Sequence, residues 1–241
     1  MLKKVEGIII KETSFGETSK IINILTKDGL IGVMAKGAKS LKSPLRSSTL
    51  SLTYAEFNLY YHEDKLSILK SADVINDFTN IKKDIVLISY MTYLCELASN
   101  VMKQNPNSEI YDLLISALNK INNGLNPMIL TNIFEIKLLD YLGVGINFNG
   151  CIKCGSSSDI ITIDADAGGY ICQNCYENEI IYDDKTIKML RMYYLVDINS
   201  ISDLKISDIV INNINHFINT YYDRYTGLYL KSKKFLEEMV S

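Results

Sequence analysis

The spacing of hydrophobic and polar residues changes close to residue 80. Before that point, apolar residues alternate with polar ones or gather in short β-branched runs, which is typical of β-strands. After Asp77 they recur every three or four residues, which indicates helices with one apolar face. The pattern therefore predicts a β-rich domain at residues 1–80 and a helical domain at residues 81–241, an α+β protein.

The first domain contains five predicted strands. They cover residues 5–11, 20–26, 30–36, 52–61 and 65–72. Asp28 and Gly29 predict a tight hairpin turn, because both central positions of such a turn adopt positive φ. Five strands with two longer polar loops favour a small Greek-key barrel of the OB type, with an SH3-like barrel as the alternative.

The second domain contains six predicted helices. Asn126 and Pro127 mark one helix start, since Asn caps helices and Pro fits the first helical position. Asp183 or Asp184, and later Ser207, are candidate caps of two further helices. The helical segments cover residues 86–101, 111–118, 126–143, 183–195, 208–225 and 231–239.

Four of the five cysteines form a C-x2-C-x17-C-x2-C pattern. They are Cys151, Cys154, Cys172 and Cys175. Each C-x2-C pair can form a tight turn whose two thiolates converge, and two such turns supply the four sulfur ligands of a structural Zn2+. Four cysteine ligands leave no open coordination position for water or substrate. The spacing therefore predicts a structural zinc module, at residues 148–177.

Two other uses of the cysteines are less consistent with the sequence. Disulfides need an oxidising compartment, but the N-terminal residues lack an apolar run long enough for a signal peptide. A redox C-x-x-C motif belongs between a strand and a helix and would not occur twice within a short hairpin. Cys95 lies among apolar residues of a predicted helix, where a buried thiol acts as a small hydrophobic side chain.

The charge distribution suggests where a polyanion would bind. The 241 residues carry a net charge of −3, and no stretch of 18 residues is free of charge, so we expect no membrane span. Residues 1–80 contain 11 basic and 9 acidic residues, while residues 81–241 contain 14 basic and 19 acidic ones. A polyanion should therefore meet the N-terminal domain first.

A loop between the third and fourth predicted strands is the candidate DNA-binding site. It holds four cations and no acidic residue: Lys36, Lys39, Lys42 and Arg46. On an OB-type barrel such a loop can follow a phosphate backbone, while strand aromatics stack on bases. The nearest aromatics are Tyr54, Phe57, Tyr60 and Tyr61, of which alternation lets at most half face outward. The alternative is a solvated basic loop without a ligand.

Several longer motifs resemble the bacterial DNA repair protein RecO, a family of recombination mediators. The N-terminal matches are GIIIKETSFGETSKIINILTKDGLIGVMAKGAKS and FNLYYHEDKLSILKSADV. The later ones are FEIKLLDYLGVGINFNGCIKCGS, GGYICQNC and TGLYLKSKKFL. These motifs occur in the order found in the family and span nearly the whole chain. The family's basic loop is often richer in arginine than AKGAKSLKS, which is how this sequence departs from the pattern.

The resemblance implies a fold and a function. It implies an N-terminal OB domain, a helical C-terminal domain and the zinc module that many members carry. It also implies a cytoplasmic, nucleoid-associated protein that is not an enzyme. Such a protein would bind single- and double-stranded DNA, anneal complementary strands, associate with RecR and SSB, and help to load RecA onto SSB-coated DNA. The residues alone leave two alternatives open, an RNA-binding module of the translation machinery and a protein adaptor that binds no DNA.

Overall fold

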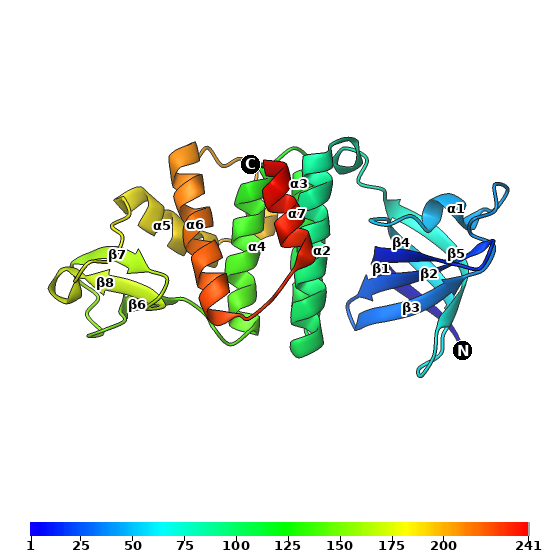
Figure 1. Ribbon diagram of the computed structural model, residues 1–241, viewed down its shortest axis with the longest axis horizontal. Helices are drawn as coiled ribbons and strands as arrows, with labels where there is room; N and C mark the ends of the chain where they lie inside the picture. Colours follow the sequence, from blue (N-terminus) through cyan, green and yellow to red (C-terminus); the bar gives the residue numbers. More distant parts are fainter. Residues whose placement is uncertain (241) are drawn as a thin grey trace. The chain divides into compact units, whose positions relative to one another are not determined.

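Residues 1–240, which the computed structural model describes, divide into two units (Figure 1). The first unit comprises Met1–Asn123 and the segment that begins at Leu230, and the second comprises Gly124–Tyr229. The domain boundary predicted between residues 80 and 81 lies inside the first unit. The division into domains 1–80 and 81–241 stays a prediction.

The N-terminal strands form a closed barrel in the order β1-β2-β3-β5-β4, which confirms the predicted five-stranded barrel. The strands are β1 (Leu2–Phe15), β2 (Ser19–Thr26), β3 (Gly29–Ala35), β4 (Tyr54–Tyr60) and β5 (Ser67–Asn76). A short parallel pairing of β3 with β5 closes the barrel, and the other neighbours are antiparallel. The helix α1 (Leu45–Ser48) lies between β3 and β4 in the chain.

Alternation along the strands separates the barrel core from its outer face. Ile22, Val33 and Phe57 are fully buried inside the barrel. Ile21 and Met34, one position away on β2 and β3, are only half-buried, because successive side chains point to opposite faces. The strand β1 is longer than predicted because its first half pairs with β4 and its second half with β2.

Helices α2 (Ile85–Gln104), α3 (Ser108–Asn122) and α7 (Lys231–Val240) complete the first unit, with a short 3-10 turn, η1 (Ile81–Lys83). α2 packs against α3 and α7. Two contacts join the barrel to α3: the Asn76 amide donates to Asn119 at 3.0 Å, and Lys27 pairs with Asp112 at 2.9 Å. The barrel and its neighbouring helices are therefore positioned by specific polar contacts.

The helix α2 is also long and apolar enough to cross a membrane, judged by length and composition alone. Most of its apolar stretch, 61%, is buried inside the protein. Core helices of proteins that never enter a membrane pass the same test, so this is weak support for a span.

The second unit packs α4 (Pro127–Tyr141), α5 (Asp184–Leu195) and α6 (Asp208–Tyr225) against one another. Asn126 and Asp183 cap α4 and α5 as predicted, each accepting two backbone N–H bonds. Ser207 occupies the cap position of α6, but its side chain accepts no capping bond. The cysteine module is a three-stranded sheet that ends in the 3-10 turn η2 (Gln173–Cys175). Its sheet order is β6 (Asn147–Cys151), β8 (Gly169–Cys172), β7 (Ile160–Asp164). A further 3-10 turn, η3 (Ile198–Ser200), lies between α5 and α6 in the chain.

Candidate metal centre and nucleic-acid interface

Each cysteine pair lies where a strand of the module ends in a tight turn. Cys151 ends β6, and its carbonyl accepts a hydrogen bond of 2.7 Å from the backbone N–H of Gly155. Gly155 has a φ of +77°, which a residue with a side chain rarely adopts. Cys172 ends β8, and the turn η2 carries Cys175 back toward it. The local backbone therefore turns both pairs of thiols toward one point.

The four sulfur atoms are positioned to bind a metal ion. All four lie within 4.8 Å of one another, and those of Cys154 and Cys172 are 3.6 Å apart. In a tetrahedral site with Zn–S bonds of ~2.3 Å, the sulfurs would be about 3.8 Å apart. The cluster therefore fits a tetrahedral four-thiolate site, and the sulfurs need to move only a little to close around an ion.

Two thiols of the cluster have pKa values shifted in opposite directions. Burial would raise the pKa of the Cys151 thiol, but backbone N–H groups of Cys172, Cys154 and Lys153 donate to it and lower that pKa to about 6. Cys175 behaves in the opposite way, because hydrogen bonds with the side chains of Cys154 and Cys172 raise its pKa to about 12. Thiols that share protons in this way release them when a metal binds.

Tyrosines of α6 attach the cysteine module to the helices. The Tyr225 hydroxyl donates to the backbone carbonyl of Asp166 at 2.6 Å. The Tyr221 hydroxyl lies 3.1 Å from the carbonyl of Val144, in the segment that leads into β6. Gly168 lies against both hydroxyls, since an added Cβ would be 3.2 Å from that of Tyr225 and 3.7 Å from that of Tyr221. The module is thus held against a helix at several points.

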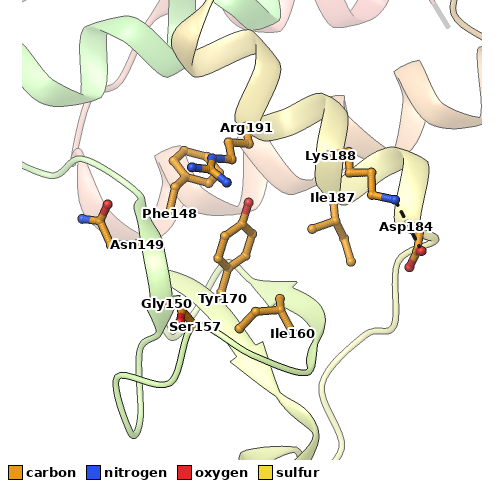
Figure 2. A pocket seen from close by; sticks show the side chains of 10 residues that line it. All are labelled: Phe148, Asn149, Gly150, Ser157, Ile160, Tyr170, Asp184, Ile187, Lys188 and Arg191. Carbon is orange, nitrogen blue, oxygen red and sulfur yellow. Dashed lines mark ion pairs between the residues drawn. The ribbon is translucent and has the colours of Figure 1, made fainter.

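A cleft of about 420 Å3 lies between the module and α5 (Figure 2). Its apolar walls include Phe148, Tyr170 and Ile187, and in Figure 2 the Tyr170 hydroxyl points toward Arg191. Lys188 and Asp184 form an ion pair of 3.7 Å at the rim. Motif analysis missed this cleft, because its walls come from elements far apart in the sequence and no spacing rule connects them.

Of the four cations predicted to bind DNA, Lys36, Lys39 and Lys42 lie in the loop that follows β3, and Arg46 lies in the short helix α1 that continues it. Lys36, Lys42 and Arg46 are exposed, and Lys39 is half-buried. The backbone N–H of Lys39 donates to the carbonyl of Thr18 at 2.8 Å, and its ammonium reaches the carbonyl of Gly16 at 3.2 Å. None of the four forms an ion pair within residues 1–240. The loop thus carries positive charge that the described part of the chain leaves uncompensated.

Three of the four candidate stacking aromatics already pack against the protein itself. Phe57 is buried in the barrel core, and Tyr54 stacks on Phe78 at a ring distance of 6.3 Å. The Lys3 ammonium lies 4.9 Å above the Tyr61 ring. Tyr60 remains 48% exposed on the outer face of the barrel. This agrees with the expectation that at most half of these rings can face outward.

Comparison with known proteins gives a consistent result over the whole length. Residues 1–78 match the family model described as Recombination protein O N terminal, and residues 82–234 match Recombination protein O C terminal. The chain belongs to the RecO family. It is 35% identical to the DNA repair protein RecO of Listeria monocytogenes serotype 4b, across 99% of this chain and 95% of that one. It is 32% identical to the same protein of Bacillus subtilis strain 168, across 100% of this chain and 96% of that one.

Proposed function

We propose that this RecO family member is a recombination mediator that binds single- and double-stranded DNA through Lys36, Lys39, Lys42 and Arg46. The observation that carries the proposal is the uncompensated charge of this loop on an OB-type barrel. Lysine and arginine that neutralise phosphates release condensed counterions, which drives binding without reading sequence. The proposal includes no catalytic step.

The same charge gives a mechanism for strand annealing. Two DNA strands repel each other through their phosphates, and cations on the protein reduce that repulsion while both strands are bound. Bases that leave SSB can then meet and pair. With RecR as partner, the protein would help to load RecA onto SSB-coated DNA, and it would act in the cytoplasm at the nucleoid.

We propose Zn2+ as the ion held by Cys151, Cys154, Cys172 and Cys175. The cysteine-only ligand set and its tetrahedral spacing support this choice, since thiolates select soft or borderline metals. Bound zinc supplies structural cross-linking of the two turns and no chemistry with substrate. The ligands hold the module in the conformation that the tyrosines of α6 contact.

Fluorescence anisotropy with labelled single-stranded and duplex DNA tests the loop. The variant with Lys36, Lys39, Lys42 and Arg46 all changed to Glu should bind both ligands much more weakly than the wild type. For single strands, the slope of log K against log salt concentration should fall by about 3, since each phosphate contact contributes about 0.7. Wild-type affinity in this variant would contradict the assignment. A wild-type protein that binds no DNA would favour an adaptor, and a preference for structured RNA would favour a translation factor.

Annealing and partner binding need a separate test. SSB-coated complementary strands should anneal faster with the wild-type protein than with the loop variant, and purified RecR should bind both proteins equally. Loss of RecR binding in the loop variant would show that the loop is a protein contact as well as a DNA contact.

A further inference from the structure

A groove runs between α2 and the outer face of the barrel within the first unit. Its volume is about 400 Å3, which lies in the ~300–1,000 Å3 range of ligand pockets. Lys11 and Asn23 lie on the barrel side, at paired positions of β1 and β2. The α2 side is polar over three turns, although the rest of this helix is largely apolar and buried; its residues are Thr92, Glu96, Ser99, Asn100 and Lys103.

Some polar groups of the groove already have partners. The Glu96 carboxylate accepts hydrogen bonds from the backbone N–H of Ser232, at 2.9 Å, and from the Ser232 hydroxyl, at the start of α7. The Thr92 hydroxyl donates to the carbonyl of Ile88 at 2.8 Å, within α2. These bonds position α2 and α7 and require no ligand.

Other groups of the groove have no such partner. Lys11 on the barrel and Lys103 on α2 are exposed and form no ion pair with any residue that the structure describes. The Asn23 side chain likewise makes no hydrogen bond within the described residues. The groove thus offers two cations and an amide, a set suited to an anion that also accepts hydrogen bonds.

The groove is continuous with the outer face that leads to the basic loop. Lys11 is paired with Asn23, which is paired with Gly32. Lys36 follows Gly32 by four residues, about 13 Å along the strand direction at ~3.3 Å per residue. On the two strands between Lys11 and Lys36, the side chains of Ile21 and Met34 face outward and are paired with each other.

We propose that this groove binds the phosphate backbone of a single strand of nucleic acid, whose bases lie on Ile21 and Met34. The inference rests on the proposed function, because the strand would continue from the basic loop. A chain of phosphates with flat bases matches cations at both ends and an apolar surface between them. The bases of a duplex are paired inside and are not free to lie on this apolar surface. The groove would therefore add a preference for single strands.

The test compares two double charge reversals by anisotropy, with a labelled oligothymidine and a blunt duplex. In Lys11→Glu/Lys103→Glu, oligothymidine affinity should fall roughly 20-fold at ~0.1 M salt, and the salt slope should fall by about 1.4, as two phosphate contacts predict. Duplex affinity should stay within about twofold of wild type. Lys185→Glu/Lys205→Glu is the control, since both lysines are exposed in the second unit and the net charge changes equally.

A third variant tests the sign of the effect. Glu96→Gln removes a negative charge from the groove, while its side chain can still accept the bonds from Ser232. Oligothymidine should bind more tightly to this variant than to the wild type, a gain that damage to the fold would not produce.

If the lysine reversal leaves oligothymidine binding unchanged, or weakens duplex binding equally, the groove inference is wrong while the loop assignment stands. If the wild-type protein binds no DNA, both fail together.

Discussion

The barrel and the cysteine module are both small β-structures, but different forces hold them together. The barrel closes on itself and buries a continuous apolar core that includes Ile22, Val33 and Phe57. The module has three short strands, and the positions that converge at its centre are cysteines. A closed sheet can be stable through burial alone, whereas a short open sheet needs cross-links or neighbouring elements. The barrel should therefore stay folded when the metal is removed. The module should stay folded when a packing contact inside the barrel core is removed.

Metal removal should have the largest effect, and it should be confined to the module. Zinc binding contributes on the order of 10–16 kcal/mol in small zinc domains, more than any single contact in the protein. Treatment with a chelator, or the change Cys154→Ser, should abolish zinc binding and expose residues 152–175 to protease. Cys154 is exposed, so its replacement removes a ligand without opening a core.

The control for metal removal is Cys95→Ala, which removes a buried thiol outside the cluster. It should keep the full zinc content of the wild type, measured by elemental analysis. DNA binding by the basic loop should survive zinc removal. Loss of DNA binding in parallel with zinc would mean that the module supports the barrel surface as well as itself.

A core substitution in the barrel should have the reverse pattern. Phe57→Ala should lower the free energy of unfolding by about 3–5 kcal/mol, because a fully buried ring leaves a cavity. Urea unfolding followed by circular dichroism measures this loss, and zinc content should remain unchanged. Tyr60→Ala, three residues along the same strand, is the matched control and should cost below about 0.5 kcal/mol, as is usual for exposed positions.

The difference between the two regions also explains what the sequence could predict. Strand alternation around Ile22 and Val33 indicates a core directly, so the barrel and its five strands follow from periodicity. The strand ends do not: β1 extends beyond the predicted residues 5–11 at both ends, and β5 ends at Asn76, beyond the predicted residue 72. The cysteine spacing predicts a metal cluster, because the geometry of a four-thiolate site determines how the cysteines are spaced. The hairpin turn at Asp28 and Gly29 was predicted correctly, but the predicted backbone conformation was wrong. Positive φ was expected at both residues, and only Gly29 has it. The Thr26 hydroxyl accepts from the Asp28 N–H and donates to the Gly29 carbonyl, which stabilises this turn.

Features that depend on three-dimensional proximity lay beyond the sequence. The groove needs Lys11 and Lys103, which are separated by 91 intervening residues, to face each other. The attachment of the module needs Tyr225 to reach Asp166. The polar residues involved occur at ordinary helical spacing, so nothing in the sequence distinguishes them from a solvated helix surface. Tertiary packing alone selects which of them meet.

A smaller effect should come from backbone conformation at the edge of the module. Gly168→Ala should cost about 1–2 kcal/mol in the stability of the second unit, since φ is +88° there. The added methyl would also press on the Tyr225 hydroxyl. Gly16→Ala in a barrel turn is the control, because φ is also positive but no atom lies within 4 Å of the new methyl. Thermal unfolding of both variants should show the larger loss for Gly168→Ala; equal losses would mean that backbone strain alone matters.

The smallest effect tests the attachment itself. Tyr225→Phe removes one hydrogen bond to the Asp166 carbonyl and should cost about 0.5–1.5 kcal/mol. Because the ring still packs on Tyr221, at 4.6 Å between ring centres, the helix should stay intact. Hydrogen exchange should therefore speed up in β7 and β8 and remain slow in α6. Tyr229→Phe, at an exposed position, is the control and should change neither rate. Unchanged exchange in β7 and β8 of Tyr225→Phe would mean that the metal cluster alone orders the module, and that the helix contact follows from that order.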